Sequence, residues 1–322
     1  MNNKRALITG INGQDGAYLA EYLIELGYDV FGLIRRHSIS ENQDARIVHL
    51  PVESFYGDLT DPVSLNRIVR DVNPHEIYNL GAMSHVRISF DSPIYAIQTN
   101  AVGVINMLEA MRNEAPGARF YQASSSECFG NSIDSDGFQR ETTPMIPVSP
   151  YGCAKVFGYN IVRHYRAAYN IFAANGTLFN HESPRRGLNF VTQKVVHTAC
   201  QIKLGNEEKL TLGNIDAARD WGHSYDYVRA MHLILQHDVP DDFCISTGET
   251  HTIRDLCNLV FCELGMHYKE YLEYDEKYTR PEELDILRGD CSKAKRILGW
   301  KPTYTYESMI KEMIEFKMKE LS

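Results

Sequence analysis

The chain of 322 residues carries 33 basic and 42 acidic side chains, and its net charge of −9 disfavours general nucleic-acid binding. No apolar run approaches the ~20 residues that a membrane-spanning helix needs, and the N-terminal residues lead directly into a strand, so neither a membrane protein nor a secreted protein is expected. The seven cysteines contain no C-x-x-C pair and the twelve histidines no H-x-x-x-H spacing. We therefore expect reduced thiols, no metal site and a cytoplasmic protein.

Strand-like runs alternate with helical runs along the first 180 residues. The strand-like runs are 4–9, 29–34, 53–57, 75–80, 119–124 and 171–179. This alternation predicts an α/β fold, a Rossmann-type doubly wound parallel sheet with helices on both faces. Because the length exceeds that of a usual single domain, we expect residues 1–180 to form a dinucleotide-binding domain. Residues 181–322 would form mostly a smaller α/β lobe for the substrate, with some segments returning to the first domain.

The first strand leads into a glycine-rich turn, GINGQDG at 10–16, which is followed by apolar residues at helical spacing. Glycines let the backbone approach a pyrophosphate, whose charge is met by free N–H groups and the positive end of the helix. The turn therefore predicts a dinucleotide site. The residues assigned to it are Gly10, Asn12, Gly13, Gln14, Asp15 and Gly16.

The second strand ends at Arg35 and Arg36, about twenty residues after the glycines, where a site for NAD usually carries an acid. Guanidinium groups pair well with phosphate, so the two arginines favour NADP through its 2′-phosphate, with NAD as the alternative cofactor. A solvated basic strand end or a subunit contact is the competing interpretation. Asp58 follows the third strand, where it would contact the adenine edge or cap the helix that starts near Pro62.

The fourth strand ends in Asn79-Leu80-Gly81-Ala82, where a glycine-alanine turn allows the backbone to approach a cofactor at the carboxyl edge of the sheet. Further residues of the first domain are assigned to the cofactor. They are Leu59, Leu80, Ala82, Ser84 and Tyr95.

Tyr151 and Lys155 have the spacing Y-x-x-x-K, and the fifth strand delivers Ser125 and Glu127 toward the same edge. Residues four apart share one face of a helix, so we expect Lys155 to lower the pKa of Tyr151 and make the phenol a usable base. By itself the pair also occurs by chance on surface helices. Glu127 has a competing role as the cap of a turn after the strand.

After residue 180 the sequence becomes dense in polar groups, notably at 180–187, 219–221 and 279–283. Separated arginines in an acidic chain suit a ligand that bears a diphosphate, although a surface salt bridge explains any single one. Residues 291–302 predict an amphipathic helix closed by glycine and followed by proline, with a structural role.

Eight motifs together resemble the GDP-mannose 4,6-dehydratases, which are extended short-chain dehydrogenase/reductases that act on nucleotide sugars. They are GINGQDG, Arg35-Arg36, NLGAMSHV (79–86), SSSE (124–127), SPYGCAK (149–155), FNHESPRRG (179–187), RDWGH (219–223) and RPEE (280–283). The resemblance covers nearly the whole chain. It implies an NADP-dependent hydro-lyase that converts GDP-mannose to GDP-4-keto-6-deoxymannose and assembles as a homotetramer or homodimer.

The resemblance also implies roles for individual residues. Tyr151 would take the proton of the sugar 4-hydroxyl, Lys155 would hold the nicotinamide ribose, and Ser125 would hydrogen-bond the reacting oxygen. Glu127 would remove the C5 proton while water leaves C6. His181 and Arg186 match positions that contact the cofactor. The positions that match the GDP-sugar side are Asn180, Glu182, Lys194, Arg219, Arg280 and Glu283.

Some positions depart from the family pattern. Ser125 stands where Thr is common, and Met83 and Cys128 differ from the usual residues near the expected sugar pocket. Because a changed pocket would accept a changed sugar, a GDP-manno-heptose 4,6-dehydratase is the alternative. An epimerase needs only the hydroxyl, tyrosine and lysine, so Glu127 favours dehydration. A non-enzymatic NADP-binding regulator is the alternative from another class.

Overall fold

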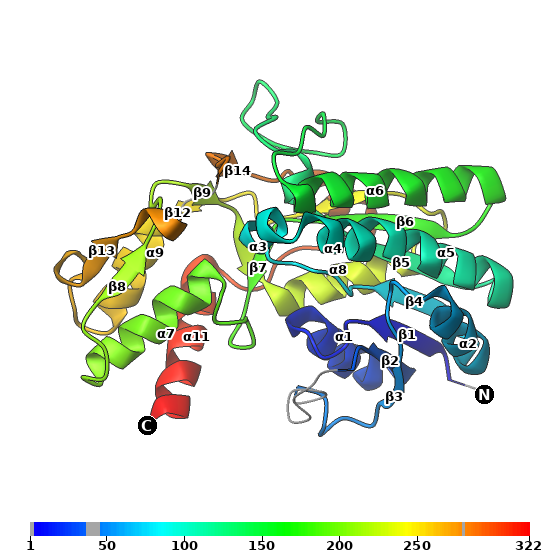
Figure 1. The fold of residues 1–322 in the computed structure, drawn as a ribbon, viewed down its shortest axis with the longest axis horizontal. Coiled ribbons are helices and arrows are strands. Elements are labelled where there is room, and N and C mark those ends of the chain that lie inside the picture. The colour runs from blue at the N-terminus through cyan, green and yellow to red at the C-terminus, as the bar shows by residue number, and fades with distance from the viewer. Residues whose placement is uncertain (1–2, 37–45, 279–280) are drawn as a thin grey trace.

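A seven-stranded parallel sheet organises the first half of the chain (Figure 1). The computed structural model describes residues 3–36, 46–278 and 281–322. The strands, in spatial order, are β11 (Phe243–Ile245), β6 (Ala173–Leu178), β5 (Arg119–Ser125), β4 (Glu76–Asn79), β1 (Arg5–Thr9), β2 (Asp29–Ile34) and β3 (Glu53–Tyr56). The doubly wound fold and its six predicted strands are confirmed. The sequence pattern missed β11, which has three residues and comes from the C-terminal half.

Helices cover both faces of the sheet because successive side chains of each strand point to opposite faces. Ala6 and Ile8 pack with α1 (Gln14–Glu25) and α8 (Ser224–Gln236). The intervening Leu7 packs on the other face. The helices of that face are α2 (Pro62–Val72), α5 (Gly103–Glu114) and α6 (Pro150–Tyr169). The shorter helices between β4 and α5 are α3 (Val86–Asp91), α4 (Pro93–Ile97) and the π-helix η2 (Gln98–Val102).

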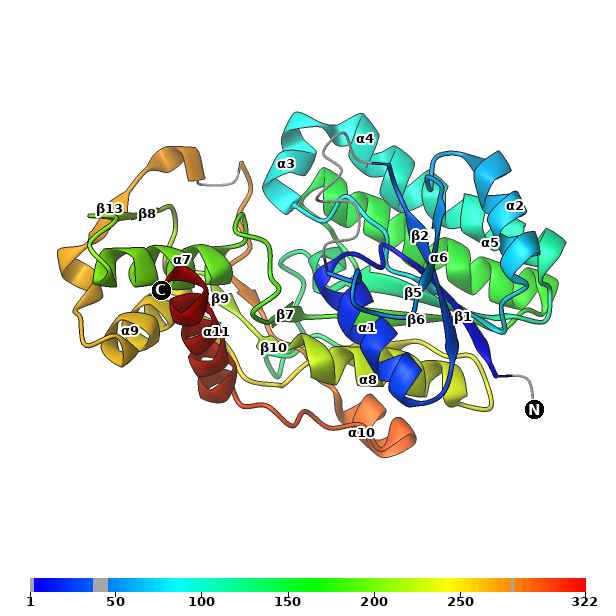
Figure 2. The same ribbon diagram turned by 90° about the horizontal axis from the view of Figure 1, so that it is seen from below.

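A second group of elements has its own hydrophobic cluster and lies beside the sheet (Figure 2). It contains α7 (Val191–Lys203), α9 (Ile253–Glu263), α11 (Tyr306–Leu321) and the strand pair β8 (Leu210–Leu212) and β13 (Leu272–Tyr274). From the same half of the chain, α8, β11 and α10 (Ser292–Leu298) pack with the first sheet. The division into two domains at residue 180 stays a prediction.

Short strands connect the two groups. They are β7 (Asn180–Glu182) paired with β10 (Trp221–His223), and β9 (Ala218–Arg219) between β12 (His251–Thr252) and β14 (Ile286–Leu287). Short 3₁₀ turns are η3 (Ser126–Cys128), η4 (Tyr268–Glu270) and η5 (Glu276–Tyr278). Among the described helices, none is both long and apolar enough to cross a bilayer.

Local sequence signals explain where the helices near the cavity begin and end. Ser149 caps α6 by accepting a hydrogen bond from the Gly152 N–H at 3.0 Å, and Asn170 ends the helix in the left-handed region at φ 53°. The helix after β3 is capped by Asp61, which accepts from the Val63 N–H at 3.1 Å. The capping role considered for Asp58 was therefore wrong, because the carboxylate of Asp58 accepts from Thr60 instead. Helix α10 ends at Gly299 with φ 65°, as its sequence predicts.

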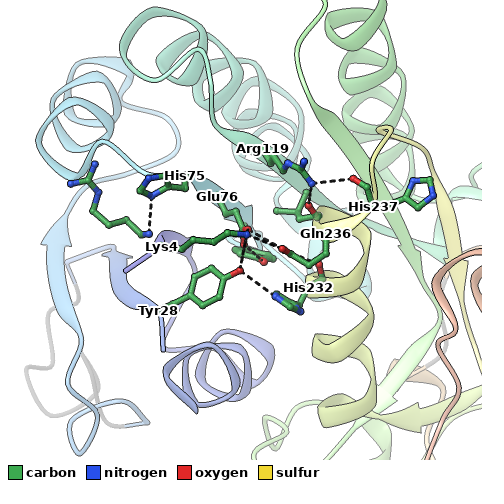
Figure 3. A network of polar contacts seen from close by, with 11 residues as sticks. Lys4, Tyr28, His75, Glu76, Arg119, His232, Gln236 and His237 are labelled. Atoms are coloured by element: carbon green, nitrogen blue, oxygen red, sulfur yellow. Dashed lines mark hydrogen bonds and ion pairs between the residues drawn. The ribbon is translucent and has the colours of Figure 1, made fainter. Parts of the chain in front are cut away.

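A buried carboxylate, Glu76, joins the amino ends of the strands at the sheet edge opposite the glycine turn (Figure 3). Glu76 is 1% exposed, and its oxygens accept hydrogen bonds from Lys4 (3.1 Å), Tyr28 (3.1 Å), Gln236 (3.0 Å) and Tyr78 (2.8 Å). Burial alone would raise the pKa of Glu76, but these donors together lower it. The carboxylate thus ties β1, β4 and the end of α8 together.

Replacement of this carboxylate should destabilise the protein. We expect E76A to lower the free energy of unfolding by about 3 kcal/mol at pH 7, because four donors lose their acceptor. Urea denaturation followed by circular dichroism measures the change, with the exposed E53Q as a control expected to stay within about 0.5 kcal/mol. Because the pKa is lowered in the folded state, the deficit should shrink only below pH of about 4.3. An E76A protein as stable as the wild type would contradict this role.

Candidate active site

A cavity of about 350 Å³ lies at the carboxyl edge of the sheet and extends toward the second group of helices. Its lining includes residues from β5, α6, β7, α7 and β9, so both halves of the chain contribute. Fifteen of the predicted site residues line it: Asp15, Leu80, Ala82, Ser84, Ser125, Glu127, Tyr151, Lys155, Asn180, His181, Glu182, Arg186, Lys194, Arg219 and Glu283. The parallel fold therefore gathers segments that lie far apart in the sequence.

The glycine turn is packed so closely that side chains are excluded from it. A Cβ on Gly10, whose φ is +68°, would lie 2.9 Å from the backbone of Gly81. A Cβ on Gly16 would lie 2.4 Å from the Gly10 carbonyl oxygen. Gly13 precedes α1 and provides no capping side chain, so the first turn of the helix keeps N–H groups that suit a pyrophosphate. The glycine turn and the first turn of α1 therefore fit the pyrophosphate of a dinucleotide.

Other residues assigned to the cofactor lie at the same sheet edge but do not line the cavity. Arg35 donates a short hydrogen bond to the hydroxyl of Tyr95, and Arg36 is exposed at the end of β2. Leu59 is buried. The sequence analysis missed Arg46, which donates to the Asn12 carbonyl of the glycine turn at 3.0 Å. Arg280 lies outside the described residues.

The four residues predicted to be catalytic meet in the cavity. Ser125 ends β5, and its hydroxyl caps η3 by accepting a hydrogen bond from the Glu127 N–H at 3.3 Å. The side chain of Glu127 lines the cavity. The Tyr151 N–H donates to Ser89 at 3.2 Å, which fixes the start of α6. Lys155 donates to the Ala123 carbonyl at 2.8 Å and lies 5.7 Å from the Tyr151 ring centroid. Backbone contacts thus hold both ends of the pair.

Burial determines the protonation of this pair. Desolvation raises the pKa of Tyr151, although a hydrogen bond with Ser125 acts in the opposite direction. Desolvation also lowers the pKa of Lys155 to about 8. The expectation that Lys155 lowers the pKa of Tyr151 was therefore wrong: burial raises that pKa, and the opposing groups are Ser125 and Arg186.

The side predicted to hold the GDP-sugar contains cations that the protein already positions. Lys194 donates to the Thr211 carbonyl at 2.7 Å and lies 3.4 Å from the ring centroid of Tyr278. Arg219 donates to the Leu284 carbonyl at 3.0 Å. The Oδ1 atom of Asn180 is buried without a hydrogen-bond partner among the described residues, so a ligand group that donates there would satisfy it.

Glu182 has a different environment from these cations. It is 2% exposed, accepts from the Thr192 hydroxyl at 2.6 Å, and pairs with Arg186 at 3.0 Å. The Arg186 guanidinium in turn lies 3.5 Å from the ring centroid of Phe190. Glu182 therefore orients Arg186 at the cavity wall.

Several aromatic residues of the lining were not predicted as site residues. His85, Phe190 and Tyr278 line the cavity, and only His85 lies in a motif that had been singled out. Met83 and Cys128, which were expected near the sugar pocket, are next in sequence to the lining residues Ala82, Ser84 and Glu127. Cys128 is fully buried, and neither residue is part of the lining. Asn100 instead holds the Met83 backbone with hydrogen bonds of 2.8 and 2.9 Å.

Because Lys155 is buried as a cation at neutral pH, its replacement should stabilise the fold. We expect K155M to raise the free energy of unfolding by about 1–2 kcal/mol at pH 7. Its depressed pKa of about 8 means that the folded protein binds fewer protons than the unfolded chain above that pH. Wild-type stability should therefore recover, and the advantage of K155M shrink, as pH rises toward about 10.4. Urea melts at pH 7 and 9.5 test this, with the exposed K301M as the control; a destabilised K155M would contradict it.

Comparisons with known proteins agree with this arrangement. Residues 7–313 match the family described as GDP-mannose 4,6 dehydratase. The chain is 46% identical to the Homo sapiens GDP-mannose 4,6 dehydratase over 338 residues, covering 96% of this chain and 90% of that protein. It is 45% identical to the Yersinia enterocolitica enzyme of the same name over 347 residues, covering 97% and 93%.

Solved structures share the fold. A Thermotoga maritima UDP-glucose 4-epimerase superposes with a TM-score of 0.87 at 25% identity, covering 99% of this chain and 100% of that one. A Bacillus anthracis dTDP-glucose 4,6-dehydratase superposes with a TM-score of 0.83 at 22% identity, covering 98% and 97%. The solved structures show the shared fold, and the family match over residues 7–313 with the full-length sequence relatives shows the family: the chain belongs to the GDP-mannose 4,6-dehydratase family.

Proposed function

We propose that the protein is an NADP-dependent hydro-lyase that converts GDP-mannose to GDP-4-keto-6-deoxymannose. The observation that carries the proposal is the presence of Glu127 in one cavity with Ser125, Tyr151 and Lys155. A hydroxyl, a tyrosine and a lysine are sufficient to move hydride on and off C4. Elimination of water additionally requires a group that removes the C5 proton, which Glu127 supplies.

The glycine cradle and its surroundings fit a nicotinamide dinucleotide. The first turn of α1 would meet the pyrophosphate, and Lys155 would hold the nicotinamide ribose. Arg35 follows β2 and contacts Tyr95 of α4, and its guanidinium would bind the 2′-phosphate of NADP. NAD, which lacks the 2′-phosphate, is the alternative cofactor. When bound, the cofactor would supply hydride transfer: it would accept a hydride from C4 of the sugar and give it back at C6.

The side chains of the cavity would handle the protons of the reaction. Tyr151 takes the proton of the 4-hydroxyl, with Ser125 hydrogen-bonded to the same oxygen. Once C4 is a ketone the C5 proton becomes acidic, and Glu127 removes it and delivers it to the C6 hydroxyl, which leaves as water. C6 then receives the hydride that left C4, and C5 receives the proton that Tyr151 took from the 4-hydroxyl. The sugar loses one water and the cofactor ends in its starting state, so the reaction is redox-neutral.

The second half of the cavity would bind the GDP moiety. Lys194 and Arg219 offer positive charge to the diphosphate, and Asn180 offers an amide oxygen that lacks a partner among the described residues. Arg280 and Glu283 keep their predicted roles on this side.

Self-association and a cytoplasmic location belong to the same proposal. Ile94, Ile97 and Phe157 are exposed on the adjacent helices α4 and α6, where a second copy of the chain would cover them. The homotetramer and the homodimer both remain consistent with such a contact. All seven cysteines are free thiols, as suits a reducing compartment.

The conservative variant E127Q tests the dehydratase assignment. We expect cofactor binding to stay within about twofold of the wild type while the dehydration rate falls by about 10²–10⁴-fold, because the amide cannot accept the C5 proton. The rate is followed by mass spectrometry as loss of one water from GDP-mannose. Retained dehydration by E127Q would overturn the role of Glu127.

The same assay with wild-type protein separates the alternatives. Turnover of GDP-manno-heptose in place of GDP-mannose would identify the heptose enzyme. NADPH binding without turnover of either sugar would favour the regulator.

The variant R35A tests cofactor preference. We expect the affinity for NADPH to fall about 10-fold or more while that for NADH changes little, because one guanidinium partner of the 2′-phosphate is lost. Fluorescence titration with both cofactors measures the ratio, and R296A, at an exposed site on α10, is the control. An unchanged ratio of NADPH to NADH affinity would contradict the role of Arg35 in binding the 2′-phosphate. It would favour the competing interpretation, in which Arg35 is a solvated basic residue at a strand end or part of a subunit contact.

A further inference from the structure

The first turn of α1 contains a carboxylate, Asp15, at the position where a pyrophosphate would bind. Asp15 is half-buried and lines the cavity. One of its oxygens accepts from the Ser224 hydroxyl at 2.6 Å, and the other lies 2.8 Å from Nε2 of His181. A bare carboxylate at this position would repel an incoming pyrophosphate, so the charge of Asp15 needs a partner.

The geometry of His181 determines its charge. Its Nδ1 lies 2.7 Å from the Phe179 carbonyl oxygen, and its Nε2 faces the Asp15 carboxylate. Both neighbouring atoms are acceptors, so both ring nitrogens must donate, and only the imidazolium form does so. The ring also stacks on Tyr227 of α8 with centroids 4.5 Å apart. The pair is therefore an imidazolium bound to a carboxylate.

The environment of the pair is consistent with this charge state. Burial disfavours both ions, yet their mutual attraction and hydrogen bond lower the pKa of Asp15 and raise the pKa of His181. The groups that face the imidazole are Asp15 from α1, Tyr227 from α8 and Arg186 from the turn after β7, and the Arg186 cation opposes protonation of His181.

The neighbouring residues connect the glycine turn to β7. Gln14 donates to the His181 carbonyl at 3.1 Å and accepts from the Ser183 hydroxyl at 2.8 Å. Asn180 and Glu182, on either side of His181, line the cavity. The contacts of Gln14 therefore join the glycine turn, where the cofactor is expected, to β7, whose residues line the side of the cavity expected to bind the sugar.

We propose that the His181 imidazolium is a positioning group that neutralises Asp15 and holds the glycine turn against β7, so that dinucleotide binding is coupled to protonation of His181. The inference rests on the proposed use of a nicotinamide dinucleotide. By linkage, if the protonated ring favours binding, then binding favours the protonated ring, and the protein takes up protons as the dinucleotide binds.

The test measures proton uptake on binding of NADPH to the full chain. Isothermal titration calorimetry in two buffers of different ionisation enthalpy gives the number of protons taken up between pH 7 and 9.5. This range avoids the 2′-phosphate, whose pKa is about 6. Lys155, whose pKa is about 8, titrates in the same range in every variant, so the contribution of His181 is the difference between wild type and H181N. We expect clearly greater uptake in the wild type than in H181N, and a wild-type affinity that weakens about tenfold as pH rises through the raised pKa of His181.

A pair of variants separates charge neutralisation from mere packing. At pH 7, H181N should bind NADPH about tenfold or more weakly, because Asp15 stays ionised without its partner. The double variant D15N/H181N should recover to within about threefold of the wild type, because the repulsive charge is gone. If the ring only fills space, the double variant should bind no better than H181N. Near-ultraviolet circular dichroism checks that each variant is folded.

A matched control comes from the opposite edge of the sheet. E76Q perturbs the buried carboxylate network at the amino ends of the strands (Figure 3), so it should lower stability and leave proton uptake unchanged. Uptake no greater than that of H181N, in a wild type that binds NADPH, would overturn the inference. Failure of the wild type to bind either NADPH or NADH would instead overturn the proposed cofactor.

Discussion

Every pairing in the seven-stranded sheet is parallel, so the carboxyl ends of all its strands lie at one edge. This constraint brings the glycine turn after β1, the turn after β4 and Ser125 at the end of β5 to one place. The close approach of Gly10 to Gly81 shows how tightly these turns pack. The cavity exists because β6 continues into β7, which carries the second wall to the same edge.

Desolvation has opposite outcomes for the buried ions of this protein, depending on their partners. Glu76 and Asp15 remain carboxylates because each collects several donors. Lys155 has a single carbonyl acceptor, and its pKa falls to about 8. Lys155, which is expected to take part in the chemistry, is thus less well compensated than Glu76 and Asp15.

Sequence reasoning succeeded where the signal was local. The strands, the glycine turn and the glycine that ends α10 follow from residues adjacent in the chain, and the structure confirms them. It was wrong about the pKa of Tyr151, which depends on burial by distant segments. It also missed β11, whose three residues become a strand only because β6 offers them an edge.

The sequence alone determined the fold class and the glycine turn, because both depend on residue type and short-range spacing, and its resemblance to a known family supplied the four residues expected to be catalytic. Only the tertiary structure decided that His181 faces Asp15 across 166 positions of sequence, that Arg35 contacts Tyr95, and that Glu182 holds Arg186 rather than standing alone. The physical reason is that charge compensation and desolvation depend on which atoms become neighbours, and spacing along the chain does not encode those contacts.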